Sequence, residues 1–352
     1  MQGTQEEKQG HPAWAVRLLT AAGALVLLFA LAAGPALAAG GHTVGRTVIP
    51  VGRAVGIKLF SDGVLVVGLS GVETGGGSAD PAKACGLKEG DIITHINSAE
   101  VDTIEEVRSI LQDLSGERMS LRVRRDGKEV QMTAQAVKCA ADGSYKLGAW
   151  IRDSMAGIGT ITFYDPASGV FGALGHGVSD VDTAQLMPLQ SGSIMYAEVS
   201  DVRRGAAGTP GELHGTFQVE RDLGELYANT SSGLFGTTDG SGLLDGQEPV
   251  PVASRAQVRT GKATILSNVT GDRVEEYEIE IVRIYPEGEG RDMTIRVTDP
   301  RLLERTGGIV QGMSGSPILQ DGRLAGAVTH VLVNDPVQGY GILAEHMTAA
   351  AE

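Results

Sequence analysis

A serine bracketed by glycines stands at position 314, in the segment Gly312-Met313-Ser314-Gly315-Ser316-Pro317. Flanking glycines let the backbone turn sharply and bring N–H groups toward a reacting carbonyl. The residues that follow read as a strand, an Asp-Gly turn and a second strand, so the loop opens a β-hairpin. The pattern predicts that Ser314 is a nucleophile, although an ordinary glycine-rich turn has the same composition.

A serine hydroxyl reacts well only when a base takes its proton. His176 is the best-placed base, because it stands between two glycines at the end of an apolar strand, where its ring can face a cleft. A carboxylate is then expected to fix the imidazole tautomer. Asp299 gives the chain order His, Asp, Ser, while Asp180 and Asp182 lie nearer His176 and are alternatives.

Residues 55–137 have the element order of a small separate module. Two short apolar strands, within 63–68 and 91–96, come before a helix over 103–113, and a hairpin then turns at Asp126-Gly127. Asp102 and Glu105 form an expected capping box for the helix. With the signature PAKACGLKEGD at 81–91, this module resembles a PDZ domain of the type found in bacterial envelope proteases.

The PDZ resemblance implies a groove in which an extended peptide adds to a sheet edge beside the helix. We expect the segment Phe60 to Leu69 to supply that edge. The residues predicted to contact the peptide ligand are Leu65, Val67, Val107 and Leu111. Val107 and Leu111 also fit a plain core position in the helix.

Four stretches carry a second resemblance, to the SpoIVB-type sporulation peptidases: IRDSMAGIGT at 151–160, ALGH at 173–176, GGIVQGMSGSP at 307–317 and GAVTHVLVNDP at 326–336. That family places a PDZ domain before a trypsin-like double β-barrel, behind an N-terminal membrane segment. The resemblance implies a peptidase domain over 140–352, with Ser314 and His176 catalytic and Asp299 preferred as the third member.

The trypsin-like pattern G-D-S-G-G-P fits Ser314 better than the rival Ser316. By the geometry of chymotrypsin-type proteases, the N–H groups of Gly312 and Ser314 then form the oxyanion hole. Met313 replaces the aspartate of that pattern, so the ion pair with a new N-terminus that activates trypsin-like zymogens is not available. His330 borders the expected specificity pocket, or packs as a strand residue.

The N-terminal residues 1–39 read as a signal peptide or a membrane anchor. An apolar run from Leu18 to Ala33 follows Lys8 and Arg17, and it is broken by Gly34-Pro35 before the small residues 36–39. Both interpretations export the rest of the chain. The resemblance to the sporulation peptidases implies that, in a spore former, it reaches the space between the mother-cell and forespore membranes.

The composition agrees with an exported, mainly β protein. The 50 glycines indicate many turns, and a formal net charge of −14 disfavours nucleic acid as a partner. No cofactor or metal set emerges, since Cys85 and Cys139 have no metal-site spacing. We predict a serine endopeptidase that binds a peptide in its PDZ domain, and the resemblance to the SpoIVB-type peptidases implies that it cuts a membrane-bound regulator and also itself. The alternative is a catalytically silent PDZ scaffold for membrane-protein tails.

Overall fold

The computed structural model describes residues 45–244, 246–287 and 291–352. The predicted leader, residues 1–39, lies outside the described residues. In the part that is described, no helix is both long and apolar enough to cross a membrane.

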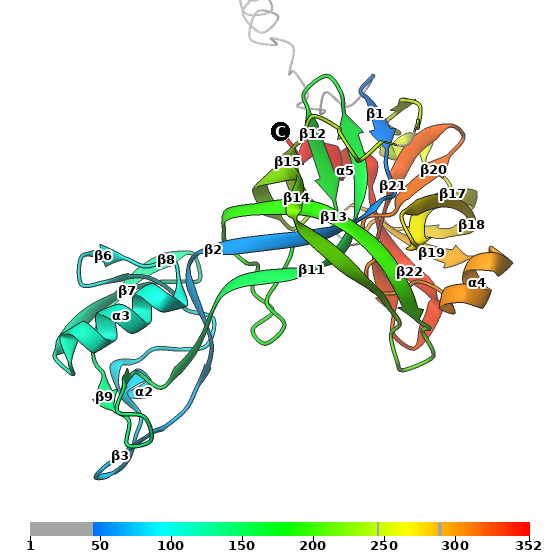
Figure 1. The fold of residues 1–352 in the computed structure, drawn as a ribbon. Helices are drawn as coiled ribbons and strands as arrows, with labels where there is room; N and C mark the ends of the chain where they lie inside the picture. Colours follow the sequence, from blue (N-terminus) through cyan, green and yellow to red (C-terminus); the bar gives the residue numbers. More distant parts are fainter. Residues whose placement is uncertain (1–44, 245, 288–290) are drawn as a thin grey trace, which may run out of the picture. The chain divides into compact units, whose positions relative to one another are not determined.

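A first barrel is formed by long antiparallel strands that close into a ring, in the order β11, β12, β15, β14, β13, β2 and back to β11 (Figure 1). Strands β1 and β16 extend this sheet beside β11. The bounds are β1 Thr47–Pro50, β2 Ala54–Leu69, β11 Ala149–Asp165, β12 Val170–Ala173, β13 Leu189–Arg203, β14 Glu212–Thr230, β15 Gly233–Thr237 and β16 Val250–Pro251.

A second closed barrel has the order β17, β18, β19, β22, β21, β20. The mainly β prediction with two barrels is confirmed. The bounds are β17 Gly261–Thr270, β18 Arg273–Ile284, β19 Met293–Val297, β20 Pro317–Gln320, β21 Arg323–Leu332 and β22 Asp335–Leu343, with the short helices η1 Arg255–Gln257, α4 Pro300–Thr306 and α5 Ala344–Ala349.

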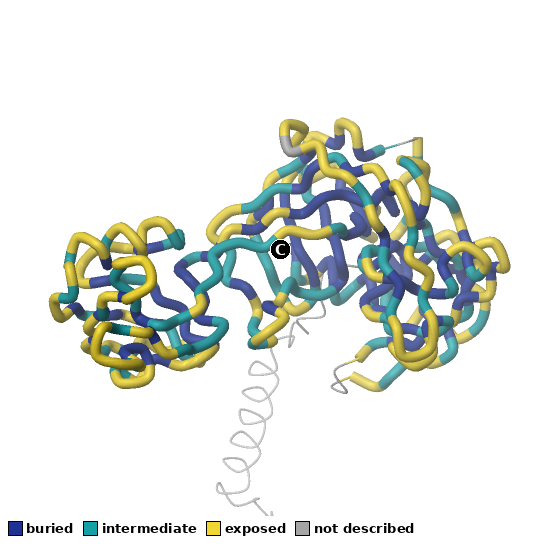
Figure 2. Tube along the Cα trace, turned by 60° about the horizontal axis from the view of Figure 1, so that its bottom comes forward, coloured by how far each residue is buried: buried dark blue, intermediate teal, exposed yellow. Residues whose placement is uncertain are grey.

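Side-chain alternation along the strands builds the barrel cores. In β18, Tyr277, Ile279 and Ile281 are buried, whereas the glutamates between them face outward, as the period of two in a strand requires. The first barrel is filled around Ile161, Phe171 and further apolar residues. Buried residues accordingly line the insides of both barrels, and the turns are exposed (Figure 2).

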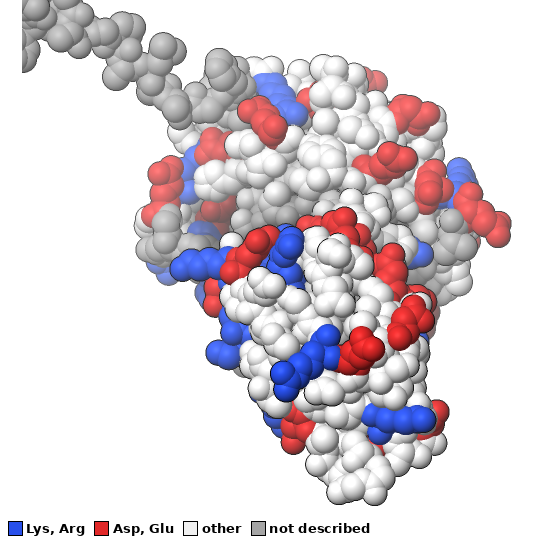
Figure 3. Space-filling view, turned by 90° about the vertical axis from the view of Figure 1, so that its left-hand side faces the viewer, with Lys and Arg blue, Asp and Glu red and all other residues white. Residues whose placement is uncertain are grey.

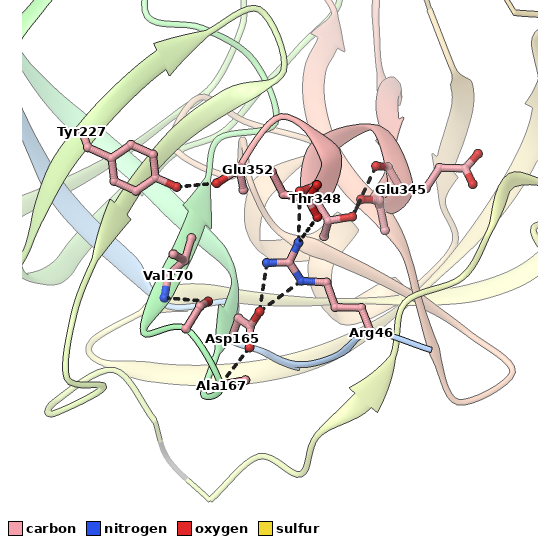
Figure 4. A network of polar contacts seen from close by, with 11 residues as sticks. Arg46, Asp165, Ala167, Val170, Tyr227, Glu345, Thr348 and Glu352 are labelled. Carbon is pink, nitrogen blue, oxygen red and sulfur yellow. Dashed lines mark hydrogen bonds and ion pairs between the residues drawn. The ribbon is translucent and has the colours of Figure 1, made fainter. Parts of the chain in front are cut away.

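The C-terminal helix α5 ties the second barrel to the first. Met347 packs with Phe163 and Phe235 of the first barrel. Arg46 donates to the Asp165 carboxylate at 2.9 Å and to the backbone oxygen of Thr348 at 3.1 Å (Figure 4). Tyr227 donates to the backbone oxygen of Ala351 at 2.7 Å. These bonds hold the two barrels together on the side where the chain ends.

The PDZ-like module lies between the first two long strands of the first barrel in sequence. Its helix α3 begins after Thr103, whose side chain accepts from the N–H of Glu106 while the Glu106 carboxylate accepts from the N–H of Thr103. The predicted capping box was therefore one residue too early. The elements are β3 Val72–Thr74, β4 Gly77–Ala79, α2 Pro81–Cys85, β5 Ile92–Ile96, β6 Ala99–Glu100, α3 Ile104–Leu114, β7 Arg118–Arg125, β8 Lys128–Gln135, β9 Val137–Lys138 and β10 Tyr145–Lys146.

The predicted module boundaries cut through two shared strands. Residues 54–61 of β2 pair with β13 and β11 in the first barrel, although the module was expected to begin at 55. At the other end, Leu147, Ala149 and Ile151 pack on the core of the PDZ-like module, beyond its expected end at 137. β2 and β11 thus each belong to both units.

Charged side chains of both signs are interspersed over the face shown in Figure 3. Exposed pairs such as Arg124 with Asp62 and Lys83 with Asp80 belong to the PDZ-like module. Each such surface pair contributes at most about 1 kcal/mol, so the fold depends on its apolar cores instead.

Candidate active site

The loop before β20 carries Ser314 and is bonded to the first barrel. Thr160 of β11 donates its N–H to the Ser314 carbonyl at 3.0 Å and its hydroxyl to the Gly312 carbonyl at 2.8 Å. Gly315 adopts φ +97°, and a Cβ there would lie 1.9 Å from the Thr160 carbonyl oxygen. Only glycine fits this close approach between the barrels.

Of the two serines in the loop, only Ser314 faces a cleft. Its hydroxyl donates to the Thr329 carbonyl at 2.6 Å. Ser316 is fully buried, and its hydroxyl bonds the Ser267 hydroxyl at 3.1 Å. The structure thus supports Ser314 over Ser316 as the nucleophile.

The backbone N–H groups of Gly312 and Ser314 have no hydrogen-bond acceptor among the described residues. Met313, between them, is completely buried in the core of the second barrel. Burial of the Met313 side chain holds the loop in place, whereas the trypsin-like pattern would have an aspartate here that forms an ion pair with a new N-terminus. The two N–H groups remain free to receive an oxyanion.

A strained turn presents His176 at the end of β12. Leu174 and Gly175 adopt φ +68° and +69°, and this left-handed conformation is costly for leucine. The His176 Nδ1 lies 2.8 Å from the Gly177 carbonyl oxygen. Because a carbonyl only accepts, Nδ1 carries the proton and Nε2 is left as the basic nitrogen.

His330 lies against His176, with ring centroids 4.6 Å apart and planes inclined by 35°. Burial lowers the pKa of His176, and its bond to Gly177 acts in the opposite direction. The pKa of His330 is also lowered, first by desolvation and then by the proximity of His176. Two neutral rings are therefore favoured near neutral pH.

Ser314, His176 and His330 line one cleft of about 580 Å³ between the barrels. Its walls are mostly apolar, and the described residues that line it include no Asp or Glu. The apolar wall residues are Ile57, Leu59, Met155, Ala156, Ile158, Leu174, Val178, Pro210, Ile309, Val310, Val331 and Val333.

The predicted carboxylates lie elsewhere. Asp299 is the N-cap of α4, where it accepts from the N–H and guanidinium of Arg301 and from the Glu278 N–H. Arg301 lowers the Asp299 pKa to about 2. Asp180 and Asp182 both pair with Arg152. In the described part of the chain, no hydrogen bond joins any of the three aspartates to His176, so the structure does not assemble the predicted third member.

Sequence reasoning did not identify the groups that hold the His176 loop. The Gly177 carbonyl occupies the place expected for a carboxylate. The side chain of Asn229 accepts from the Val178 N–H at 2.9 Å and donates to the Val178 and Met187 carbonyls. A backbone carbonyl has no sequence signal, and Asn229 stands near a strand end where asparagine is common.

The predicted PDZ edge is already occupied. Leu65 pairs with Ile92 of β5 on one side and with Arg152 of β11 on the other, and it is fully buried. A peptide therefore cannot add at Leu65, and the neighbouring Val67 packs against the same buried cluster. Val107 and Leu111 are buried in the module core. The edge that remains beside α3 belongs to β11, at residues 149–153.

Comparison with known families matches residues 143–348 to SpoIVB peptidase S55 and residues 76–125 to the PDZ domain. The chain belongs to the SpoIVB peptidase S55 family. The resemblance seen in the motifs is therefore confirmed, and so is the predicted class of enzyme, a serine peptidase. The S55 match covers the second barrel and most of the first, apart from β1 and β2, and it includes Ser314 and His176.

Other known proteins are similar to this S55 peptidase over shorter stretches. The zinc metalloprotease RasP of Shouchella clausii is 38% identical over 58 residues, which cover 16% of this chain and 14% of that relative. The Rv3671c protease of M. tuberculosis in its active form is 15% identical, with a TM-score of 0.32, over 56% of this chain and 73% of the other. A PDZ domain of an SdrC-like protein from Listeria monocytogenes is 21% identical, with a TM-score of 0.21, over 26% and 87%.

Proposed function

We propose that this chain is an exported serine endopeptidase in which Ser314 and His176 act as a dyad. The observation that carries the proposal is their position on one cleft, with Nδ1 of His176 fixed by the Gly177 carbonyl. That bond leaves Nε2 as the base, which is the tautomer that activation of a serine needs.

In this mechanism the Ser314 hydroxyl rotates from the Thr329 carbonyl toward His176 and attacks the substrate carbonyl carbon as Nε2 takes its proton. The N–H groups of Gly312 and Ser314 receive the oxyanion. His176 then protonates the leaving amine, which departs and leaves an acyl group on Ser314. A water molecule gives a proton to Nε2 and attacks this ester, and His176 returns the proton to the Ser314 oxygen as the carboxylic acid product leaves. A neutral carbonyl stabilises the imidazolium less than a carboxylate would, so we expect a slower enzyme than one with a full triad.

The wall composition supports an apolar substrate residue at the scissile bond. Burying one large aliphatic side chain in such a cleft contributes about 1.5–3 kcal/mol. Val331 and Ile309 are among the residues that would contact it. We infer that leucine-like residues are preferred over charged ones.

A fluorophosphonate probe tests the catalytic assignment. The intact wild-type chain should be labelled, and Ser314→Ala and His176→Ala should lose labelling. Ser316→Ala is the matched control, because it removes a hydroxyl from the same loop and should retain labelling if it folds, as checked by circular dichroism. Equal labelling of Ser314→Ala and the wild type would overturn the nucleophile, and an unlabelled wild type would favour the silent scaffold.

The substrate proposal is a membrane-associated regulatory protein in a spore former, with self-cleavage as a second reaction. The apolar leader at 18–33 and the name of the family support it. Cell fractionation should place the wild type outside the cytoplasm, and mass spectrometry of cells carrying wild type or Ser314→Ala should reveal membrane-protein fragments only with the wild type. Identical fragment sets in both strains would refute this substrate class.

A further inference from the structure

Strand β11 has one edge that no other strand covers for much of its length. Residues 149–160 pair with β2 along one side, and β12 and β1 join β11 only from Ile161 onward. Among the described residues, the backbone groups on the opposite side of 149–159 form no hydrogen bond with another backbone group. An uncovered row of N–H and C=O groups is a template for an added strand.

This open edge lies beside helix α3 at its start and beside the Ser314 cleft further along. Beside 149–153 stands α3, whose N–H at Ile104 donates to the Asp153 carboxylate at 2.9 Å. Beyond the crossing into the first barrel, Met155, Ala156, Gly157 and Ile158 line the cleft that holds Ser314. The ribbon shows β11 running as one strand from the PDZ-like module to the barrels (Figure 1). The PDZ edge and the catalytic cleft therefore share one strand.

The start of this edge has the features of an anion site. Gly148 adopts φ +75°, and the N–H groups of Leu147 and Gly148 have no acceptor among the described residues. Successive free N–H groups around a left-handed residue form a concavity that binds anions, including a peptide's terminal carboxylate.

We propose that the substrate adds to the open edge of β11 as an antiparallel strand, with its C-terminal carboxylate at Leu147 and Gly148 and its scissile bond at Ser314. The direction follows because β11 runs from the anion site toward the cleft, so a chain ending at that site must run the opposite way. This inference rests on the proposed function. It makes the ligand an extended C-terminal tail that is cut a fixed distance before its end.

Strand geometry sets that distance. Residues 149–158 span about 30 Å at roughly 3.3 Å per residue, so about ten substrate residues separate the scissile bond from the C-terminus. The register between β11 and β2 shifts between Arg152 and Ser154, so the length of the strand is not fully regular. We therefore expect about 8 to 12 substrate residues between the scissile bond and the C-terminus. The substrate residues that follow the scissile bond therefore lie beside the PDZ-like module, and those that precede it do not.

A series of peptide α-ketoamides tests the length rule with the intact chain. Each carries a leucine ketoamide that reacts reversibly with Ser314, followed by 2 to 12 alternating threonine and valine residues that end in a free carboxylate. We expect the inhibition constant to fall by about tenfold or more as the extension approaches ten residues, which one or two net hydrogen bonds would supply. Matched peptides with an amide at the C-terminus lack the carboxylate, so their inhibition constant should fall less as the extension grows.

The outcomes separate this inference from the proposed function. Inhibition that stays level beyond four residues, or that is the same for carboxylate and amide ends, overturns the shared-strand site while leaving the dyad intact. If no member of the series inhibits and the fluorophosphonate does not label Ser314, the proposed function itself fails.

An N-methyl scan of the ten-residue extension checks the pairing without altering the protein. In a strand, successive N–H groups point to opposite edges. N-methylation should therefore weaken inhibition about tenfold at every second position and little at the positions between. A loss confined to the residues next to the ketoamide would overturn strand addition along β11, and so would a loss without alternation.

Discussion

The catalytic cleft and the PDZ edge of β11 both bind polypeptide in our proposals, but they are built from different parts. The cleft depends on the side chains of Ser314 and His330, which lie in neighbouring segments, and of His176, which is distant from them in sequence. The PDZ edge is the backbone of one strand. A side-chain site can be destroyed by one substitution, whereas a backbone site survives most changes that leave the strand folded.

The sharpest test of this contrast is Gly315→Ala in the loop that joins the barrels. The new Cβ would collide with the Thr160 carbonyl, and φ +97° is unfavourable for alanine. We expect a loss of about 3–5 kcal/mol in the free energy of unfolding and no measurable activity. Thermal unfolding followed by circular dichroism measures the first effect.

The control for that substitution is Gly322→Ala in the hairpin turn after β20. Gly322 also has a left-handed φ, +72°, but open space surrounds its Cβ position. It should lose only about 1 kcal/mol. Equal losses at both glycines would show that backbone strain, and not the contact between the barrels, makes Gly315 necessary.

A second test separates the core of the PDZ-like module from its ligand edge. Leu65 is fully buried, so Leu65→Ala should lower the free energy of unfolding by about 2–5 kcal/mol in a urea titration. Trp150 lies on the β11 edge with 64% of its surface exposed, and Trp150→Ala should change stability by less than about 0.5 kcal/mol. If a stable Leu65→Ala variant were inhibited equally by ketoamides of every extension length, the peptide-binding edge would lie at Leu65, as first predicted.

These differences show what sequence patterns can predict in this chain. The glycine-bracketed loop and the order of strands were predicted correctly, because turn chemistry and period-two alternation are local. The PDZ edge was wrong because strand pairing is not local: nothing near Leu65 reveals that Ala149–Arg152 returns to cover it.

The third catalytic position shows the same limit. Asp299 matched the expected chain order, yet Pro300 follows it directly, and Asp-Pro at a helix start is a common N-cap arrangement. The partner of His176 is a backbone carbonyl, which every residue has. Only the fold identifies which carbonyl lies beside Nδ1.

The pH dependence of kcat/KM offers a smaller effect within the cleft. His176 must be neutral to act as the base, so activity falls as the pH drops through its pKa. Because burial lowers that pKa below 6.5, half of the maximal rate should persist below pH 6.5. In His330→Phe, the apolar ring keeps His176 buried, so the midpoint should stay below 6.5. A midpoint above 6.5 in the wild type would contradict the burial argument.

The smallest expected effect concerns Asp299, and it decides whether the cleft works without a carboxylate. Asp299→Asn keeps a capping side chain but loses the ion pair with the exposed Arg301, so we expect about 1 kcal/mol of destabilisation at pH 7 and kcat/KM within about twofold of wild type. The depressed pKa of about 2 means that Asp299 stabilises the fold above roughly pH 4, and that this contribution disappears as the pH falls toward 2. The asparagine variant should therefore lose less stability than the wild type between pH 4 and 2. A fall of about 10³ or more in kcat at unchanged stability would instead make Asp299 a catalytic residue, because a helix cap acts on unfolding and not on the chemical step.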